Sequence, residues 1–213
     1  NIDKEMNVVE IVRSIFPAKT KDFVTAVDEH SIILVKELRE KETADEIDRI
    51  AKTIEETLNA ETNSRVYISS GTIVSDLKDV SRSYKEAKMA LEVGKIFETD
   101  KYIVNYEKLG IGRLIYQLPL PLCRMFIKEV LHGLTMDDFD DETLATVNKF
   151  FENNLNVSET SRQLYIHRNT LVYRLDKLQK MTGLDLRNFD DAIIFKITLM
   201  VSKYMIYMDK MAY

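Results

Sequence analysis

The chain contains few of the residues that interrupt or cross-link a fold. Its 213 residues include one cysteine, three prolines, six glycines and no tryptophan. The single cysteine, Cys123, excludes an internal disulfide, and its simplest interpretation is a small buried hydrophobe. Because 45% of the residues are hydrophobic, the composition favours a largely helical globular protein with enough apolar side chains to form real cores.

Long hydrophobic runs are also absent, and nothing resembles a signal peptide. The most apolar stretch, residues 193–208, is interrupted by Lys196, Ser202 and Lys203. Such interruptions are typical of an amphipathic terminal helix rather than of a bilayer segment. We therefore expect a cytoplasmic protein without membrane contact.

Groups that perform catalysis or bind metals are sparse. His30, His132 and His167 lie far apart in the sequence and show no metal-ligand spacing. Cys123 has no histidine nearby, and no glycine pattern of a nucleotide-binding loop is present. The acidic run at residues 137–142 lacks the alternating ligands and central glycine of a calcium loop, so we expect it to join two helices. The sequence predicts no metal, no cofactor and no enzyme activity.

A net charge of −5 argues against a protein that coats nucleic acid without specificity. One segment has the opposite balance. Between Ser158 and Thr182 there are five Lys or Arg residues and two Asp or Glu residues, a local charge of +3. This pattern is compatible with a site-specific DNA reader that has one basic face.

The same segment predicts two short helices joined by a tight turn, the arrangement of a helix-turn-helix. Ser158 is the expected cap of the first helix, and Leu164 and Ile166 bracket the turn. In the second helix three leucines recur at i, i+4 and i+7 and so share one buried face: Leu171, Leu175 and Leu178.

The opposite face of the second helix has the side chains of a DNA contact. Arg168 suits a bidentate contact to guanine, Asn169 one to adenine, and Thr170 a phosphate or a thymine methyl. Three further side chains are placed for phosphates or sugars, which position a protein without reading sequence: Tyr173, Arg174 and Lys177. The alternative is an ordinary helical hairpin with a solvated basic face.

The sequence of this segment resembles the C-terminal helix-turn-helix of the PucR/CdaR family of bacterial transcription regulators. The matching run is YIHRNTLVYRL at residues 165–175, followed by TGLDL at residues 182–186. The family usually has alanine where this chain has Ser161. The register is also similar to that of the Fis protein, whose turn-end residue and following arginine meet DNA. That similarity implies His167 and Arg168 as DNA contacts.

The first half of the chain predicts an α+β arrangement, an antiparallel or mixed sheet with helices on one face. A hairpin is expected at residues 22–28 and 31–38, and Thr43 with Glu46 forms a capping box for the next helix. The other expected elements are helices at residues 10–16, 43–59 and 80–97, and short strands at residues 65–69 and 101–106.

Residues 8–115 resemble the GGDEF-like domain that precedes the helix-turn-helix in CdaR-type regulators, mainly through SSGTIVSDLKDVSRSYKEAKMALEVG and YEKLGIGRLI. The resemblance implies a degenerate, incomplete ferredoxin-like fold without its first strand. Related cyclases carry Gly-Gly-Asp-Glu-Phe at the hairpin, where this chain has Ala-Val-Asp-Glu-His at residues 26–30. Ala26 and Val27 would crowd the backbone approach that glycine permits. We therefore expect a scaffold or dimerisation role.

In the second half we expect helices at residues 122–134 and 142–153 and a terminal helix at residues 192–208, capped by Asp190. One side of that last helix offers apolar residues for the core or for a dimer contact: Ile193, Ile197, Met200, Val201, Tyr204 and Met208. The sequence leaves open whether this helix or the first half forms the dimer.

These features predict two domains, a GGDEF-like α+β domain at residues 1–115 and an all-α helix-turn-helix domain at residues 120–213. The resemblance implies a sequence-specific transcriptional regulator that binds double-stranded operator DNA as a homodimer. Because the chain begins at Asn1, we expect a fragment whose small-molecule effector, such as the sugar diacid of CdaR, binds a sensor domain outside it. The alternative is a non-catalytic metabolite- or nucleotide-binding or dimerisation module that uses the helix-turn-helix only structurally.

Overall fold

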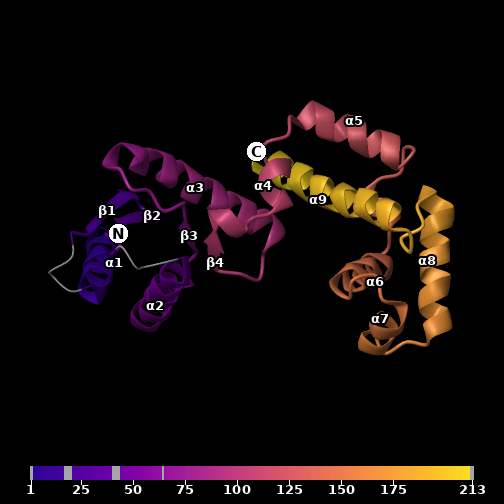
Figure 1. The fold of residues 1–213 in the computed structure, drawn as a ribbon, viewed down its shortest axis with the longest axis horizontal. Coiled ribbons are helices and arrows are strands. Elements are labelled where there is room, and N and C mark those ends of the chain that lie inside the picture. Colours follow the sequence, from indigo (N-terminus) through magenta and orange to yellow (C-terminus); the bar gives the residue numbers. More distant parts are fainter. Residues whose placement is uncertain (1, 17–20, 40–43, 64, 212–213) are drawn as a thin grey trace. The chain divides into compact units, whose positions relative to one another are not determined.

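The structure is a computed structural model that describes residues 2–16, 21–39, 44–63 and 65–211. The chain divides into two compact units, residues 1–113 and 114–213, and each is described by itself (Figure 1). None of the helices in the described ranges combines the length and the hydropathy that crossing a bilayer requires.

The first unit mixes helices and short strands, which confirms the α+β expectation. In chain order its elements are α1 (Ile2–Ile15), β1 (Phe23–Asp28), β2 (Ser31–Val35), α2 (Ala44–Thr62), β3 (Ile68–Ser70), α3 (Val80–Phe97) and β4 (Ile103–Asn105). A short helix, α4 (Ile111–Ile115), follows. The capping box predicted from Thr43 lies outside the described residues.

The strands form two separate two-stranded sheets, where the sequence suggested one sheet. Strands β1 and β2 are an antiparallel hairpin in which Phe23 is opposite Val35. Strands β3 and β4 run parallel, with Ile68 opposite Ile103, and α3 is the crossover that a parallel pair requires. Within the described ranges no strand pairs with both sheets, so the hairpin and the parallel pair are held by helix packing.

Helices α1 and α2 bury the apolar side of the hairpin. Val12 of α1, Val24 of β1, and Ile54 and Leu58 of α2 form a common core. The spacing of the buried positions in α2 is that of one helical face. Helix α3 packs against the parallel pair at Gly94, where an added Cβ would lie 2.6 Å from a methyl of Val104 in β4. Helix α3 can therefore approach the parallel pair closely.

Within its described residues the second unit consists of helices and connecting turns without a strand, which confirms the predicted class of this half. Its helices are α5 (Leu120–Val130), α6 (Asp141–Glu152), α7 (Val157–Gln163), α8 (Arg168–Thr182) and α9 (Phe189–Met211). Helix α5 packs along α9, and α8 stands at the edge of the unit beside α6 and α7 (Figure 1).

One core joins these helices. The three leucines predicted to share a face of α8, Leu171, Leu175 and Leu178, are each at most 1% exposed. They pack with Phe150 of α6 and Phe195 of α9 in the same cluster. Because burial of a large apolar side chain contributes roughly 1.5–3 kcal/mol, these residues fix the rotation of α8 about its axis.

Two predicted caps are wrong, each by two residues. Helix α7 is capped by Asn156, whose side chain accepts from the Glu159 N–H, while Ser158 lies inside the helix. Helix α9 begins before Asp190, and the side chain of Asn188 accepts the Asp190 N–H at 2.9 Å. Asparagine, serine and aspartate are nearly equally favoured as N-caps. The sequence pattern alone could therefore not decide which of two nearby residues caps the helix.

Helix α9 is apolar on more than one side. Phe195, Leu199 and Tyr204 face the core, and the Tyr204 hydroxyl donates to the Leu118 carbonyl at 3.4 Å. Of the apolar residues predicted to share one side of this helix, Val201 and Tyr204 are buried, whereas Ile193 is 41% exposed. A helix with apolar residues around most of its circumference gives no single hydrophobic face to read from sequence.

Replacing Leu175 with Ala tests the role of the α8 core. The change leaves a cavity beneath the outward face, and we expect the free energy of unfolding to fall by about 2–5 kcal/mol. Urea denaturation followed by circular dichroism measures the loss. Lys180→Ala, at an exposed position of the same helix, should change stability by less than about 0.5 kcal/mol. A similar small loss for Leu175→Ala would show that this packing does not hold α8.

Candidate nucleic-acid interface

Helices α7 and α8 are joined by a tight turn whose backbone bonds are those of a helix-ending motif. The Tyr165 N–H donates to the Arg162 carbonyl at 3.2 Å, and the Ile166 N–H donates to the Ser161 carbonyl at 3.0 Å. This pair of bonds requires a left-handed residue just past the helix, and Tyr165 has φ 55°. Leu164 and Ile166, which were predicted to bracket the turn, pack against the core of the unit.

The first turn of α8 begins at His167. This residue is the N-cap, with φ −67° and ψ 145°, and its Nδ1 accepts from the Asn169 N–H at 3.2 Å. The N-terminus of a helix has unpaired N–H groups and a partial positive charge. The end of α8 that reaches outward is therefore suited to approach the phosphate backbone or base acceptors.

Several of the predicted contact residues lie on the solvent face of α8, away from the three buried leucines. His167, Arg168, Asn169 and Thr170 are exposed, and Tyr173 is 70% exposed. The guanidinium of Arg168 donates to the Ser158 hydroxyl at 2.7 Å, which ties the start of α8 to α7. These five side chains are thus exposed around the first two turns of α8.

Arg174 is placed differently. Its guanidinium donates to the Thr146 hydroxyl at 2.9 Å and pairs with the Glu142 carboxylate, so that 18% of the side chain is exposed. A phosphate contact by Arg174 would require the Glu142 pair to open. The residue binds α8 to α6 in the structure, a role that the sequence pattern did not indicate.

Lys177 is half exposed and pairs with Asp140, at 3.3 Å between its Nζ and a carboxylate oxygen. Asp140 is the N-cap of α6, where it accepts the Thr143 N–H at 2.7 Å. The hydrogen bonds from Thr143, followed by the one from Lys177, lower the pKa of Asp140 to about 2. The acidic start of α6 therefore supplies anions to two of the cations predicted to meet phosphate.

The outer surface of α7 has its own ion pair. Arg162 donates to Glu159 at 3.0 Å from Nε, and hydrogen bonds from Arg162 and Gln163 lower the pKa of Glu159 to about 2. The Arg162 charge is thus balanced within the helix, although 72% of its side chain is exposed.

Sequence reasoning placed Tyr165 in the motif but gave it no role. Its side chain is 96% exposed, and its left-handed backbone costs a residue other than glycine roughly 1–2 kcal/mol. Glycine is the usual residue at this point of the turn. The signal available in the sequence was an aromatic residue just past a predicted helix end, a position that glycine commonly occupies.

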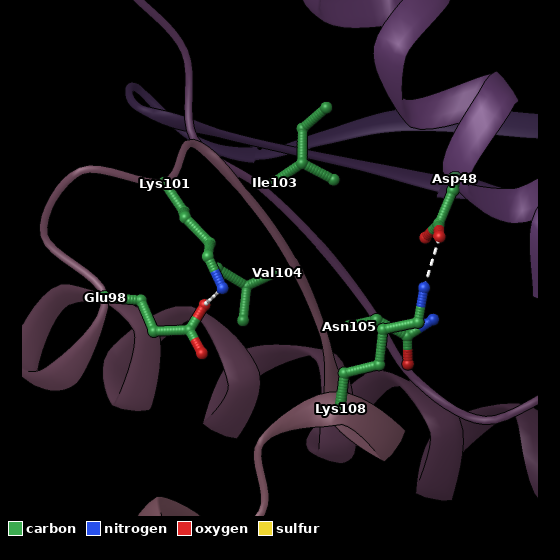
Figure 2. A pocket seen from close by; sticks show the side chains of 7 residues that line it. All are labelled: Asp48, Glu98, Lys101, Ile103, Val104, Asn105 and Lys108. Atoms are coloured by element: carbon green, nitrogen blue, oxygen red, sulfur yellow. Dashed lines mark hydrogen bonds and ion pairs between the residues drawn. The ribbon is translucent and has the colours of Figure 1, made fainter. Parts of the chain in front are cut away.

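The first unit contains a small hollow (Figure 2). It has a volume of about 190 Å³ and is lined by Asp48, Glu98, Lys101, Ile103, Val104, Asn105 and Lys108. Lys101 pairs with Glu98 at 2.8 Å and Lys108 pairs with Asp48, so the charges balance. Ligand pockets usually measure about 300–1,000 Å³, and this hollow is too small for a nucleotide.

The hairpin turn of the first unit is a solvated turn. A carboxylate oxygen of Asp28 accepts the His30 N–H at 2.8 Å, and this bond lowers the pKa of Asp28. Glu29 is exposed beside it. Within the described part of the chain, no group of three or more His, Cys, Asp or Glu side chains is arranged to hold a metal ion.

Each unit matches a known domain family over part of its length. Residues 143–201 match the PucR C-terminal helix-turn-helix domain, and residues 3–93 match the GGDEF-like domain. The chain is 28% identical over 132 residues to the purine catabolism regulatory protein of Bacillus subtilis. It is 31% identical over 139 residues to the carbohydrate diacid regulator of Escherichia coli, and 33% identical over 132 residues to the DNA-binding transcriptional activator AdeR of Bacillus subtilis.

These matches take in 62%, 65% and 58% of the chain, in the same order. They span only 25%, 36% and 30% of the relatives' own lengths. The similarity therefore concerns a part of each relative.

Replacing Asp140 with Asn tests the ion pair between α6 and α8. Asparagine still accepts the Thr143 N–H but cannot pair with Lys177 as an anion. The pKa of Asp140 is about 2 in the folded chain, below about 3.9 for an unfolded aspartate. The stabilising charge is therefore fully present above about pH 4 and is lost as the pH falls toward about 2.

We expect the Asp140→Asn variant to melt below the wild type at neutral pH, and the difference to shrink as the pH falls below about 4. Thermal melts at several pH values measure it. Asp137→Asn changes an exposed carboxylate of the same segment and controls for net charge. A difference that stayed constant down to about pH 2.5 would contradict the assignment.

Proposed function

Because the chain combines a GGDEF-like domain with a PucR-type helix-turn-helix and so belongs to the PucR/CdaR family of regulators, we propose that it is a sequence-specific DNA-binding transcriptional regulator. The observation that carries the proposal is the outward edge of α8. Arg168, Asn169 and Thr170 are exposed there, while Leu171 and Leu175 on the other face are buried.

The first turn of α8 enters the major groove in this proposal. Recognition helices reach base edges with their N-terminal residues. Arg168 supplies a bidentate donor for guanine, and Asn169 supplies the donor and acceptor that adenine requires. His167 and Thr170 lie beside them and contact neighbouring bases or phosphates. This part of the surface supplies specificity.

The remaining residues of α8 position the protein on the duplex. Tyr173 is exposed one turn after Asn169 and donates to a phosphate or packs on a sugar. Lys177 and Arg174 contact phosphates once these replace Asp140 and Glu142 as their partners. Contacts of this kind add affinity without sequence information.

The assembly and the control of this regulator are parts of the same proposal. We place the GGDEF-like domain at residues 1–115 and the helix-turn-helix domain at residues 120–213. A homodimer would present two copies of α8 to the two halves of a palindromic operator. The relatives' names refer to purine catabolism and to carbohydrate diacids, which supports a small-molecule effector acting through a further domain. The first unit serves as a scaffold rather than as an enzyme.

The decisive substitution is Arg168→Ala. The probe is a duplex that the wild-type chain selects from a randomised library, compared with an unselected duplex of the same length. We expect affinity for the selected duplex to fall by about 1–3 kcal/mol, because a bidentate base contact is lost. Binding to the unselected duplex should change much less. Fluorescence anisotropy measures both, and a thermal melt checks that the fold is kept.

Lys180→Ala is the matched control, because Lys180 is an exposed cation in the last turn of α8. It should reduce affinity for the two duplexes equally or leave both unchanged. Equal affinities of the Arg168→Ala variant and the wild type for the selected duplex would favour the alternative, in which the helix-turn-helix serves only for packing.

Glu142→Gln tests whether the acidic start of α6 competes with DNA. The change frees the Arg174 guanidinium from its carboxylate and removes a negative charge near the proposed phosphate path. We expect affinity for both duplexes to rise by about two- to fivefold at low salt, the range of an exposed ion pair. The gain should shrink as salt screens the charges. Weaker binding by this variant would mean that Glu142 positions Arg174 for DNA instead of competing for it.

A further inference from the structure

We infer that Tyr165, in the turn between α7 and α8, contacts the sugar–phosphate backbone of DNA through its phenol hydroxyl. The inference rests on the proposed DNA-binding function and extends it to a residue outside the recognition helix. Two independent observations carry it, a left-handed backbone and an almost fully exposed aromatic side chain.

The backbone at Tyr165 has φ 55°, in the region that favours glycine. The turn at the end of α8 shows the alternative, since Gly183 takes the left-handed position there with φ 79°. Glycine at position 165 would satisfy the same backbone bonds without a steric cost. The fold alone therefore gives no reason for a tyrosine at this point.

The side chain does not compensate for that cost by packing. Tyr165 is 96% exposed, whereas buried aromatic side chains normally remove a large apolar surface from water. Unfavourable backbone conformations that the surrounding fold maintains occur preferentially at functional sites. An exposed ring at a strained position indicates a contact that is made only with a partner.

The position of the turn identifies that partner. Tyr165 lies two residues before the N-cap His167, and Arg168 binds back to Ser158 of α7 across the same turn. When a recognition helix enters the major groove, the preceding helix crosses the phosphate backbone. The turn that joins them lies at the edge of the groove, where a phenol can donate to a phosphate oxygen while its ring covers a deoxyribose. Such a contact is independent of base sequence.

Two substitutions separate the contact from the backbone effect. Tyr165→Gly removes the side chain and relieves the left-handed conformation, so the melting temperature should be unchanged or raised by about 2 °C. Affinity should fall by about 3- to 10-fold for the selected and the unselected duplex alike. Tyr165→Phe keeps the backbone conformation and the ring but loses the donor, and it should weaken binding to both duplexes by about 2- to 5-fold.

His132→Gly is the matched control, because His132 is an exposed residue of the second unit with φ 51° outside the helix-turn-helix. It relieves a comparable conformation and should leave DNA binding unchanged. Arg168→Ala, measured in parallel, reports on the proposed function itself. The four variants are compared by anisotropy with the two duplexes and by thermal melts.

The outcomes are distinguishable. If Arg168→Ala weakens specific binding while both Tyr165 variants bind like the wild type, the inference fails and the proposed function stands. If only Tyr165→Gly weakens binding, the loss comes from a more flexible turn, and the inference also fails. If the wild type shows no preference for any selected duplex, the proposed function fails and the inference with it.

Discussion

The proposed DNA-binding surface depends on the burial of three leucines on one side of α8. Leu171, Leu175 and Leu178 pack against Phe150 and Phe195 and so hold the helix at one rotation. Because side chains in a helix are spaced by about 100° per residue, fixing the leucines also fixes which polar residues face outward. The outward set at the start of α8 follows from the core.

The sequence was sufficient where one periodic pattern dominates. The helix expected at residues 80–97 has the bounds of α3, Val80–Phe97, and the leucine spacing identified the buried face of α8. The choice of α+β in the first half and of an all-α second half was also confirmed. In each case the local hydrophobic pattern and the packing of the folded chain agree, and under that condition secondary structure is most accurately predicted from sequence.

The sequence was insufficient where tertiary contacts decide. The cationic side chain of Arg174 turns toward Glu142 of α6, a residue 32 positions earlier, and no local pattern indicates such a pair. Helix α9 is apolar around most of its circumference, so periodicity included the buried Val201 and Tyr204 but missed the buried Phe195 and Leu199. The exposure of Tyr165 was not predicted, because an aromatic residue in a motif suggests packing. The division of the first unit into two sheets also could not be predicted, because it depends on which strands pair in the folded chain.

The carboxylates at the start of α6 have a consequence for how the interface responds to salt. Asp140 and Glu142 already neutralise Lys177 and Arg174 in the free chain, as bound counterions would. DNA that displaces these side chains replaces internal anions instead of releasing dissolved ones. The number of ions exchanged on binding should therefore be smaller than the number of basic residues on α8, and the logarithmic salt slope correspondingly shallower.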